Sequence, residues 1–187
     1  RDITTYYNEE NHHSSMDLGS LASSCMRYSN CCEDGFFEVY EDHAKMLIFR
    51  HKEEGTIIGR AILWDCVDLD DRSIKYKVMD RIYSVERVYP FFFKWAKENG
   101  YFRKRYQSYD NELEFAPPHA ENRDETEEMN FVIEGFCVYD YEHQPYMDTF
   151  AWNDGHKSRN YCDFGHYEAR DTDGGLYGRH DEDDEDY

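Results

Sequence analysis

The chain has 187 residues, of which 40% are hydrophobic and 17% aromatic, so it can bury the core of one main domain. Its 41 acidic and 21 basic residues give a formal charge of −20, which repels nucleic-acid phosphates and argues against direct nucleic-acid binding. No run approaches the roughly 20 apolar residues that span a bilayer, so no membrane contact is expected. The acidic balance favours either simple solubility or a protein partner with a basic surface.

Residues 1–19 are polar and carry little periodicity, which predicts a flexible N-terminal segment. An α+β core is expected over residues 20–115. It contains two β-like runs, "KMLIFRH" and "TIIGRAILWD", separated by the polar turn "KEEG", and this pattern predicts a β-hairpin. Gly59 in the second run predicts a bulge or a close backbone approach.

The run "IKYKVMDRIY" alternates apolar and polar residues and predicts a third strand. One face of this strand is expected to carry Ile74, Tyr76, Val78, Asp80 and Ile82. A helix is predicted over about 88–99, with Pro90 in its first turn, an apolar stripe that includes Phe92, Trp95 and Ala96, and Gly100 as its stop. The run "YFRKRYQSY" that follows predicts a short strand or extended segment.

The composition changes after the core. Residues 116–128, "APPHAENRDETEE", predict a charged linker. Residues 129–178 predict a small β-hairpin region, because short β-like runs alternate there with turn signals such as "NDGH" and "TDGG". Residues 179–187 form an acidic tail whose charges repel one another, so it is expected to be mobile unless a basic surface holds it.

The order helix, hairpin, strand, helix, strand over residues 20–110, with "IIGRAILW" and "WAKENGY" in sequence, resembles the central part of the GNAT acyltransferase fold. This resemblance implies an antiparallel sheet with packed helices. GNAT enzymes place a Gly-rich turn between that strand and helix, where backbone N–H groups receive the pyrophosphate of coenzyme A. Here the turn is "SVERVYPF", without glycine, and Pro90 has no N–H. The expected scaffold is therefore non-catalytic and takes no cofactor.

A second set of motifs runs through the whole chain: "SSCMR", "GRAILW", "MDRIY", "RYQSY", "PYMDTF" and "DTDGG". This set resembles a family of uncharacterised proteins encoded by tailed bacteriophages and related mobile elements. The resemblance implies a viral protein in the cytoplasm of the infected bacterial host or in the virion, and it implies no reaction.

The leading interpretation is a phage-type accessory protein that binds a protein partner through an acidic, Tyr-rich surface. One alternative is an enzyme, either a GNAT-like acyltransferase or a Cys25-dependent enzyme. The other alternative is a structural component of a virus particle. The sequence does not indicate the oligomeric state.

Two residues are candidate catalytic groups. Cys25 stands where a helix can begin, and the helix dipole together with Arg27 would favour its thiolate, with His43 or His51 as the base. The alternative for Cys25 is a small buried residue. Asp80 is a candidate general base with a raised pKa, and its alternative role is a structural ion pair with Arg60.

A mixed thiolate and imidazole set is the candidate metal site. Its members are Cys137, His156, Cys162 and His166, whose spacings are compatible with zinc although no CxxC pair is present.

Overall fold

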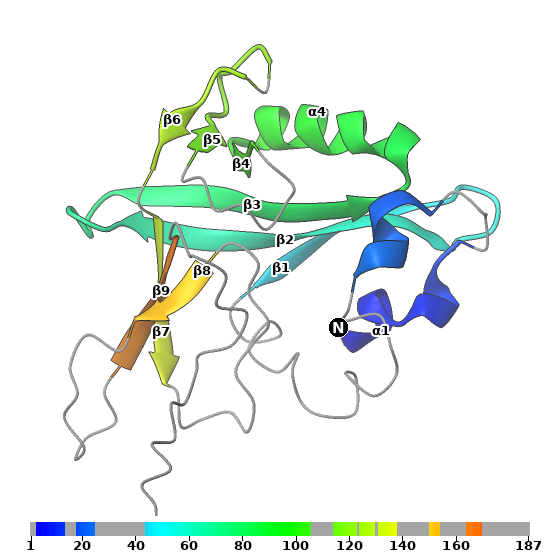
Figure 1. Ribbon diagram of the computed structural model, residues 1–187, viewed down its shortest axis with the longest axis horizontal. Coiled ribbons are helices and arrows are strands. Elements are labelled where there is room, and N and C mark those ends of the chain that lie inside the picture. The colour runs from blue at the N-terminus through cyan, green and yellow to red at the C-terminus, as the bar shows by residue number, and fades with distance from the viewer. Residues whose placement is uncertain are drawn as a thin grey trace, which may run out of the picture.

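The computed structural model describes residues 3–13, 18–24, 44–105, 114–122, 124–129, 131–137, 150–153 and 164–169. These residues form a mixed α/β fold in which a few helices accompany one mostly antiparallel, nine-stranded sheet (Figure 1). The strands are β1 (Lys45–Arg50), β2 (Ile57–Asp68), β3 (Lys75–Ser84), β4 (Phe102–Lys104), β5 (Glu114–Ala116), β6 (Glu127–Glu128), β7 (Phe131–Cys137), β8 (Phe150–Asn153) and β9 (Phe164–Ala169). The helices are α1 (Thr4–Tyr7), η1 (Glu9–Asn11), η2 (Gly19–Ser23), η4 (Glu86–Val88) and α4 (Tyr89–Asn99).

The predicted hairpin and third strand are confirmed. β1 pairs with β2 and β2 pairs with β3, both antiparallel. Side chains close the second turn: Asp68 accepts the backbone N–H groups of Asp70 and Asp71, and Asp71 accepts both the backbone N–H and the hydroxyl of Ser73. Such Asx-type bonds satisfy turn N–H groups that have no strand partner, which is why this acidic run forms a stable turn.

A register shift in the β2–β3 pair corrects the predicted face of β3. Leu63 pairs with Met79 and Ala61 pairs with Ile82. Two residues of β3 therefore lie opposite one residue of β2 between these pairs, which is a β-bulge. Because a bulge of this kind reverses the side-chain alternation, Ile82 shares the face of Met79 and not the face of Val78 and Asp80. Both Met79 and Ile82 belong to the buried cluster under α4.

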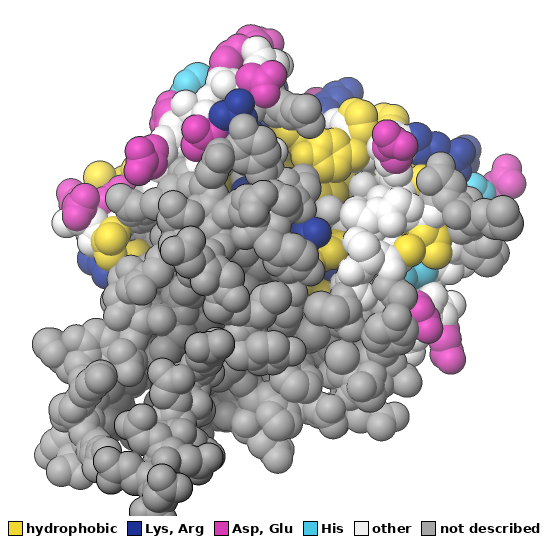
Figure 2. All heavy atoms as spheres, viewed as in Figure 1, with side chains coloured by type: hydrophobic (Ala, Val, Ile, Leu, Met, Phe, Trp, Pro, Cys, Tyr) yellow, Lys and Arg dark blue, Asp and Glu magenta, His cyan; other side chains and the backbone are white. Residues whose placement is uncertain are grey.

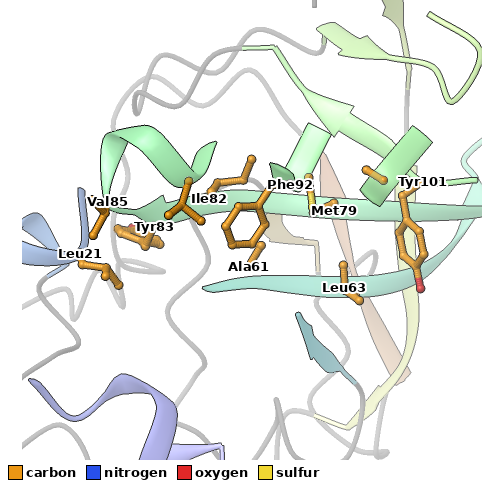
Figure 3. Close-up of a cluster of buried hydrophobic side chains, with 11 residues drawn as sticks. Leu21, Ala61, Leu63, Met79, Ile82, Tyr83, Val85, Phe92 and Tyr101 are labelled. Carbon is orange, nitrogen blue, oxygen red and sulfur yellow. The ribbon is translucent and has the colours of Figure 1, made fainter. Parts of the chain in front are cut away.

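Helix α4 packs over the middle of β2 and β3. Its Phe92 and Ala96 are fully buried, and Phe92 lies in a cluster with Ala61, Ile82 and Met79 (Figure 3). A Cβ atom at Gly59 would lie 2.7 Å from a ring carbon of Phe92, so a side chain, and not the predicted backbone segment, approaches this glycine closely.

The predicted ends of α4 are also confirmed. Pro90 stands in its first turn, where a missing N–H costs no helix hydrogen bond. Gly100 ends the helix with a left-handed φ of 77°. Trp95, predicted as a core residue, is only partly buried and packs against Tyr101 with ring centroids 5.2 Å apart. The chain then returns as β4, which runs parallel to β3.

The sheet continues on both sides of the central hairpin in the order β6-β5-β4-β3-β2-β7-β9-β8, and β1 pairs with β2 outside this path. Since β3 occupies one edge of β2, β1 and β7 share the other edge: β1 pairs with its first half and β7 pairs with Val67 and Asp68. The range 116–128, predicted as a linker, contains the end of β5 and all of β6. β7, within the predicted hairpin region, joins the same sheet as the core.

The first residues, predicted to be flexible, carry α1 and η1 and meet the core at several points. Tyr7 is buried, and His12 forms a parallel bridge with Ile57. Farther along, Ser20 accepts the backbone N–H of Ser84, so η2 covers the edge of β3 beyond the end of β4. Gly19 is required there, because a Cβ atom would lie 2.5 Å from the carbonyl oxygen of Ser84.

None of the helices in the described ranges combines the length and the apolar character that a bilayer crossing requires.

Candidate functional site

The predicted zinc set lies largely beyond the described residues. His156 and Cys162 fall outside them, and so does the candidate nucleophile Cys25. Cys137 and His166 lie on neighbouring strands, β7 and β9, where Cys137 pairs with Phe164. Only the backbone of these two residues is described, so the zinc set and the role of Cys25 stay predictions.

Asp80 is buried, with 5% of its surface exposed, on the face of the sheet opposite α4. Its carboxylate accepts the indole N–H of Trp64 at 3.0 Å and the backbone N–H of Arg81 at 2.7 Å. Burial, followed by the negative charges of Asp80 and Asp65, raises the pKa of the Cys66 thiol well above its usual value. These contacts are those of a carboxylate held inside a packed sheet, and they favour the structural role over the catalytic one.

Arg60, named in the sequence analysis as a possible ion-pair partner of Asp80, contacts the N-terminal segment. It is 1% exposed, and it donates from Nη2 to the hydroxyl of Ser24 at 2.8 Å. Its guanidinium also stands 3.8 Å from the ring centre of Tyr7 and 4.7 Å from that of Tyr83. Two aromatic faces around one buried cation supply the attraction that replaces its lost hydration. Through its contacts with Tyr7 and Ser24, Arg60 therefore binds the N-terminal segment to the sheet.

The segment between β3 and α4 is the one that the sequence comparison set against the Gly-rich cofactor turn of GNAT enzymes. It forms η4, which continues directly into α4. The N–H of Val85 donates to Ile58, that of Val88 to Val85, and that of Tyr89 to Glu86. Glu86 also places a carboxylate at this end of the helix. Backbone N–H groups that already donate to carbonyl oxygens can bind a phosphate only if the segment changes its conformation.

A group of carboxylates covers the end of the sheet formed by the β2–β3 turn and the β5–β6 connection, and we call it the acidic face (Figure 2). Its members are Asp68, Asp70, Asp71, Glu121, Asp124, Glu125, Glu127 and Glu128. Lys97 pairs with Glu121 at 3.0 Å, and Arg105 lies 3.9 Å from Asp124. Hydrogen bonds from Ser73 lower the pKa of Asp71, so this carboxylate stays charged at a lower pH than an ordinary aspartate does.

Tyr76 stands where the two segments of the acidic face meet. Its ring packs edge-on against Phe102 and Phe131, with centroids 5.4 and 5.1 Å away. Burial, together with the charges of Asp68, Glu127 and Asp71 and a hydrogen bond to Asp68, raises the pKa of the Tyr76 hydroxyl. The ring is anchored in the sheet while its polar end reaches the carboxylates.

A second group of polar side chains, which no sequence motif indicated, lies at the opposite end of β2. His13, His51 and Glu54 each offer one ligand atom, and these three atoms lie within 4.8 Å of one another. His51 was considered only as a base for Cys25. No motif spacing could have revealed this group, because His13 comes from the N-terminal segment and the other two residues come from the β1–β2 turn.

A scan against models of protein families matched none of them, and searches among curated proteins and solved structures gave no match.

Proposed function

We propose that this chain is a phage-type accessory protein that binds a protein partner with a basic surface, and that the acidic face is its contact. The observation that carries the proposal is the position of Tyr76, an anchored aromatic ring whose hydroxyl lies among Asp68, Asp71 and Glu127. Interfaces are enriched in tyrosine because its ring adds contact area at a small entropic cost and its hydroxyl bonds to polar groups.

Electrostatics support the same proposal. The chain carries a formal charge of −20, and the carboxylates of the acidic face come from short turns and strands whose backbone is held in place. A fixed patch of one sign speeds the approach of an oppositely charged partner and orients it. Because the backbone that carries these side chains is already ordered, no loop has to be ordered when the partner binds.

The scaffold is proposed to be GNAT-like but non-catalytic. The order of β1, β2, β3, α4 and β4, with β3 and β4 parallel, supports the resemblance in topology. The segment at η4 supports the absence of catalysis, since the N–H groups of Val85, Val88 and Tyr89 already donate to carbonyls and Glu86 would repel a pyrophosphate. An acyltransferase remains the alternative that the experiment below distinguishes.

The test compares two triple variants with equal charge change. Asp70→Asn, Glu127→Gln and Glu128→Gln neutralise the acidic face, whereas Glu10→Gln, Glu53→Gln and Glu86→Gln neutralise exposed carboxylates elsewhere. A partner is isolated from the infected host and purified, and association rates are measured at low and at physiological salt. The first variant should associate more slowly and show a weaker salt dependence, while the control should match the unmodified chain.

Equal slowing of both variants would show that only net charge matters, and it would contradict docking at the acidic face. Acetyl coenzyme A is tested separately by thermal unfolding. No shift in Tm is expected, and a saturable increase would favour the acyltransferase instead.

A further inference from the structure

Two histidines and a glutamate meet where the N-terminal segment touches the β1–β2 turn. Nδ1 of His13 lies 2.7 Å from Oε2 of Glu54, and the rings of His13 and His51 are stacked with centroids 4.8 Å apart. The backbone N–H of Glu54 donates to Nδ1 of His51 at 3.4 Å, which orients the His51 ring within the turn. Nδ1 of His13 thus faces the carboxylate of Glu54, and the main chain of the turn fixes the ring of His51 beside them.

The backbone around these three residues is held before any ligand arrives. The N–H of His13 donates to the carbonyl of Ile57 at 2.9 Å, which places this residue beside the start of β2. Within the turn, the N–H of His51 donates to Thr56 and that of Gly55 donates to His51. Gly55 has a φ of 71°, and its carbonyl accepts a hydrogen bond from Arg50 at 2.7 Å. The turn therefore brings His51 and Glu54 together independently of His13.

Thr56 supports the same group from one side. Its hydroxyl oxygen lies 3.1 Å from Nδ1 of His13 and donates to the carboxylate of Glu54 at 3.4 Å. Hydrogen bonds of this kind orient metal ligands in known sites and strengthen metal binding. His13 is mostly buried, with 12% of its side chain exposed, whereas Glu54 is 49% exposed, so an ion can reach the group from solvent.

We propose that His13, His51 and Glu54 bind a divalent transition-metal ion of the zinc type. Two imidazole nitrogens and one carboxylate oxygen are a donor set that suits Zn²⁺, at bond lengths of about 2.0–2.2 Å. Ligand atoms around a tetrahedral ion stand about 3.3 Å apart at such bond lengths, so atoms within 4.8 Å of one another reach it by side-chain rotation. Three protein ligands leave one coordination position for water.

The ion would join two parts of the chain that are far apart in sequence. His13 belongs to the segment that carries α1 and η1, whereas His51 and Glu54 belong to the turn between β1 and β2. A bound ion would thus stabilise the packing of the N-terminal segment against the sheet. It is separate from the acidic face and from the predicted set of Cys137, His156, Cys162 and His166, and it does not depend on the proposed function.

The experiment measures binding of Zn²⁺ and Co²⁺ to chain stripped of metal by a chelator. Isothermal titration should show a site that Glu54→Gln and His51→Gln each weaken tenfold or more. Glu53→Gln and His119→Gln are the matched controls, since they alter an adjacent exposed glutamate and a distant exposed histidine, and binding should be unchanged. The Co²⁺ complex should show visible bands of nitrogen and oxygen ligands without thiolate charge-transfer absorption.

Hydrogen exchange gives a second readout that does not depend on affinity. Zinc should slow amide exchange within residues 3–13 of the unmodified chain and have no such effect in Glu54→Gln. Unchanged binding in both ligand variants, or thiolate absorption as the sole cobalt signal, would place the metal elsewhere and overturn the proposal. An absence of zinc binding to the unmodified chain would overturn it as well.

Discussion

At the scale of single residues, the face of the sheet opposite α4 is unusual because it buries charged side chains. Asp80 and Arg60 are 5% and 1% exposed. An indole N–H and a backbone N–H contact the carboxylate, and a hydroxyl and two aromatic rings contact the guanidinium. Buried charges are tolerated only when such contacts replace water. Removal of one such neighbour should therefore lower the free energy of unfolding by more than that one contact contributes, because the buried charge is left less well satisfied.

Trp64→Phe tests this expectation. The change keeps a buried aromatic ring but removes the N–H that Asp80 accepts at 3.0 Å. Unfolding in denaturant should show a loss of about 1–3 kcal/mol, because a buried carboxylate is left with one donor fewer. Trp95→Phe is the control, since Trp95 is only partly buried, and its loss should stay below about 1 kcal/mol. Equal losses for both variants would show that ring size alone matters.

Tyr76 makes a prediction about alkaline pH. Its pKa is raised in the folded chain, so the folded state holds the phenol proton more tightly than the unfolded state, whose pKa is about 10. This contribution to stability is present below pH 10 and is lost as pH rises through the higher pKa of the folded state. Unfolding free energy should thus fall above about pH 10, and Tyr76→Phe should make the fall shallower. An unchanged slope in the variant would contradict this role.

At the scale of elements, the contact between α4 and β2 depends on a missing side chain. The ring of Phe92 occupies the space that a Cβ atom at Gly59 would need. The helix therefore approaches the hairpin at the one point of β2 where no side chain separates them. This close approach buries both Phe92 and Ala96 fully.

Gly59→Ala should destabilise the fold by about 1–3 kcal/mol, because the added methyl group must displace a buried ring. Phe92→Leu should also destabilise the chain by itself, since it leaves a cavity. The double variant should be more stable than the sum of the two losses predicts, because the smaller side chain makes room for the methyl group. Denaturant melts of the four chains measure this coupling. Additive losses would mean that the two residues do not compete for the same space.

At the scale of the whole molecule, the excess of negative charge acts against the compact state. A formal charge of −20 on 187 residues produces repulsion that folding increases by bringing the charges together. Local pairs such as Lys45 with Asp65 and Lys94 with Glu98 are exposed and contribute little. Stability should therefore depend on ionic strength.

The Tm should rise between about 0.01 and 0.1 M NaCl, over which the Debye length falls from about 30 Å to about 10 Å. The acidic-face variant, with three fewer negative charges, should have a higher Tm at low salt and a smaller rise. KCl serves as the control for specific ion effects and should give the same curve. A fall in Tm with added salt would mean that attractive pairs outweigh the general repulsion.

Local sequence patterns predicted the strands and the helix near the middle of the chain. They gave the wrong face for a residue where strand pairing introduced a bulge. The hairpin, the third strand and the ends of α4 follow from alternation, turn residues, Pro90 and Gly100, all of which act within a few residues. Ile82 was assigned to the wrong face because a bulge depends on the partner strand and leaves no mark in simple alternation. Helical spacing placed Trp95 on the apolar face of α4, but spacing alone cannot show which residues at the edge of that face are only partly buried.

The sequence by itself determined the acidic character of the molecule, its central strands and the helix between β3 and β4, because composition and short-range periodicity act along the chain. Only the tertiary structure decided which side chains meet: Tyr76 with Asp68 and Glu127, Arg60 with Tyr7, and His13 with His51 and Glu54. Each of these groups joins segments that the folded chain brings together. Contacts of this kind depend on register and on the path of the chain between elements, which no local pattern encodes.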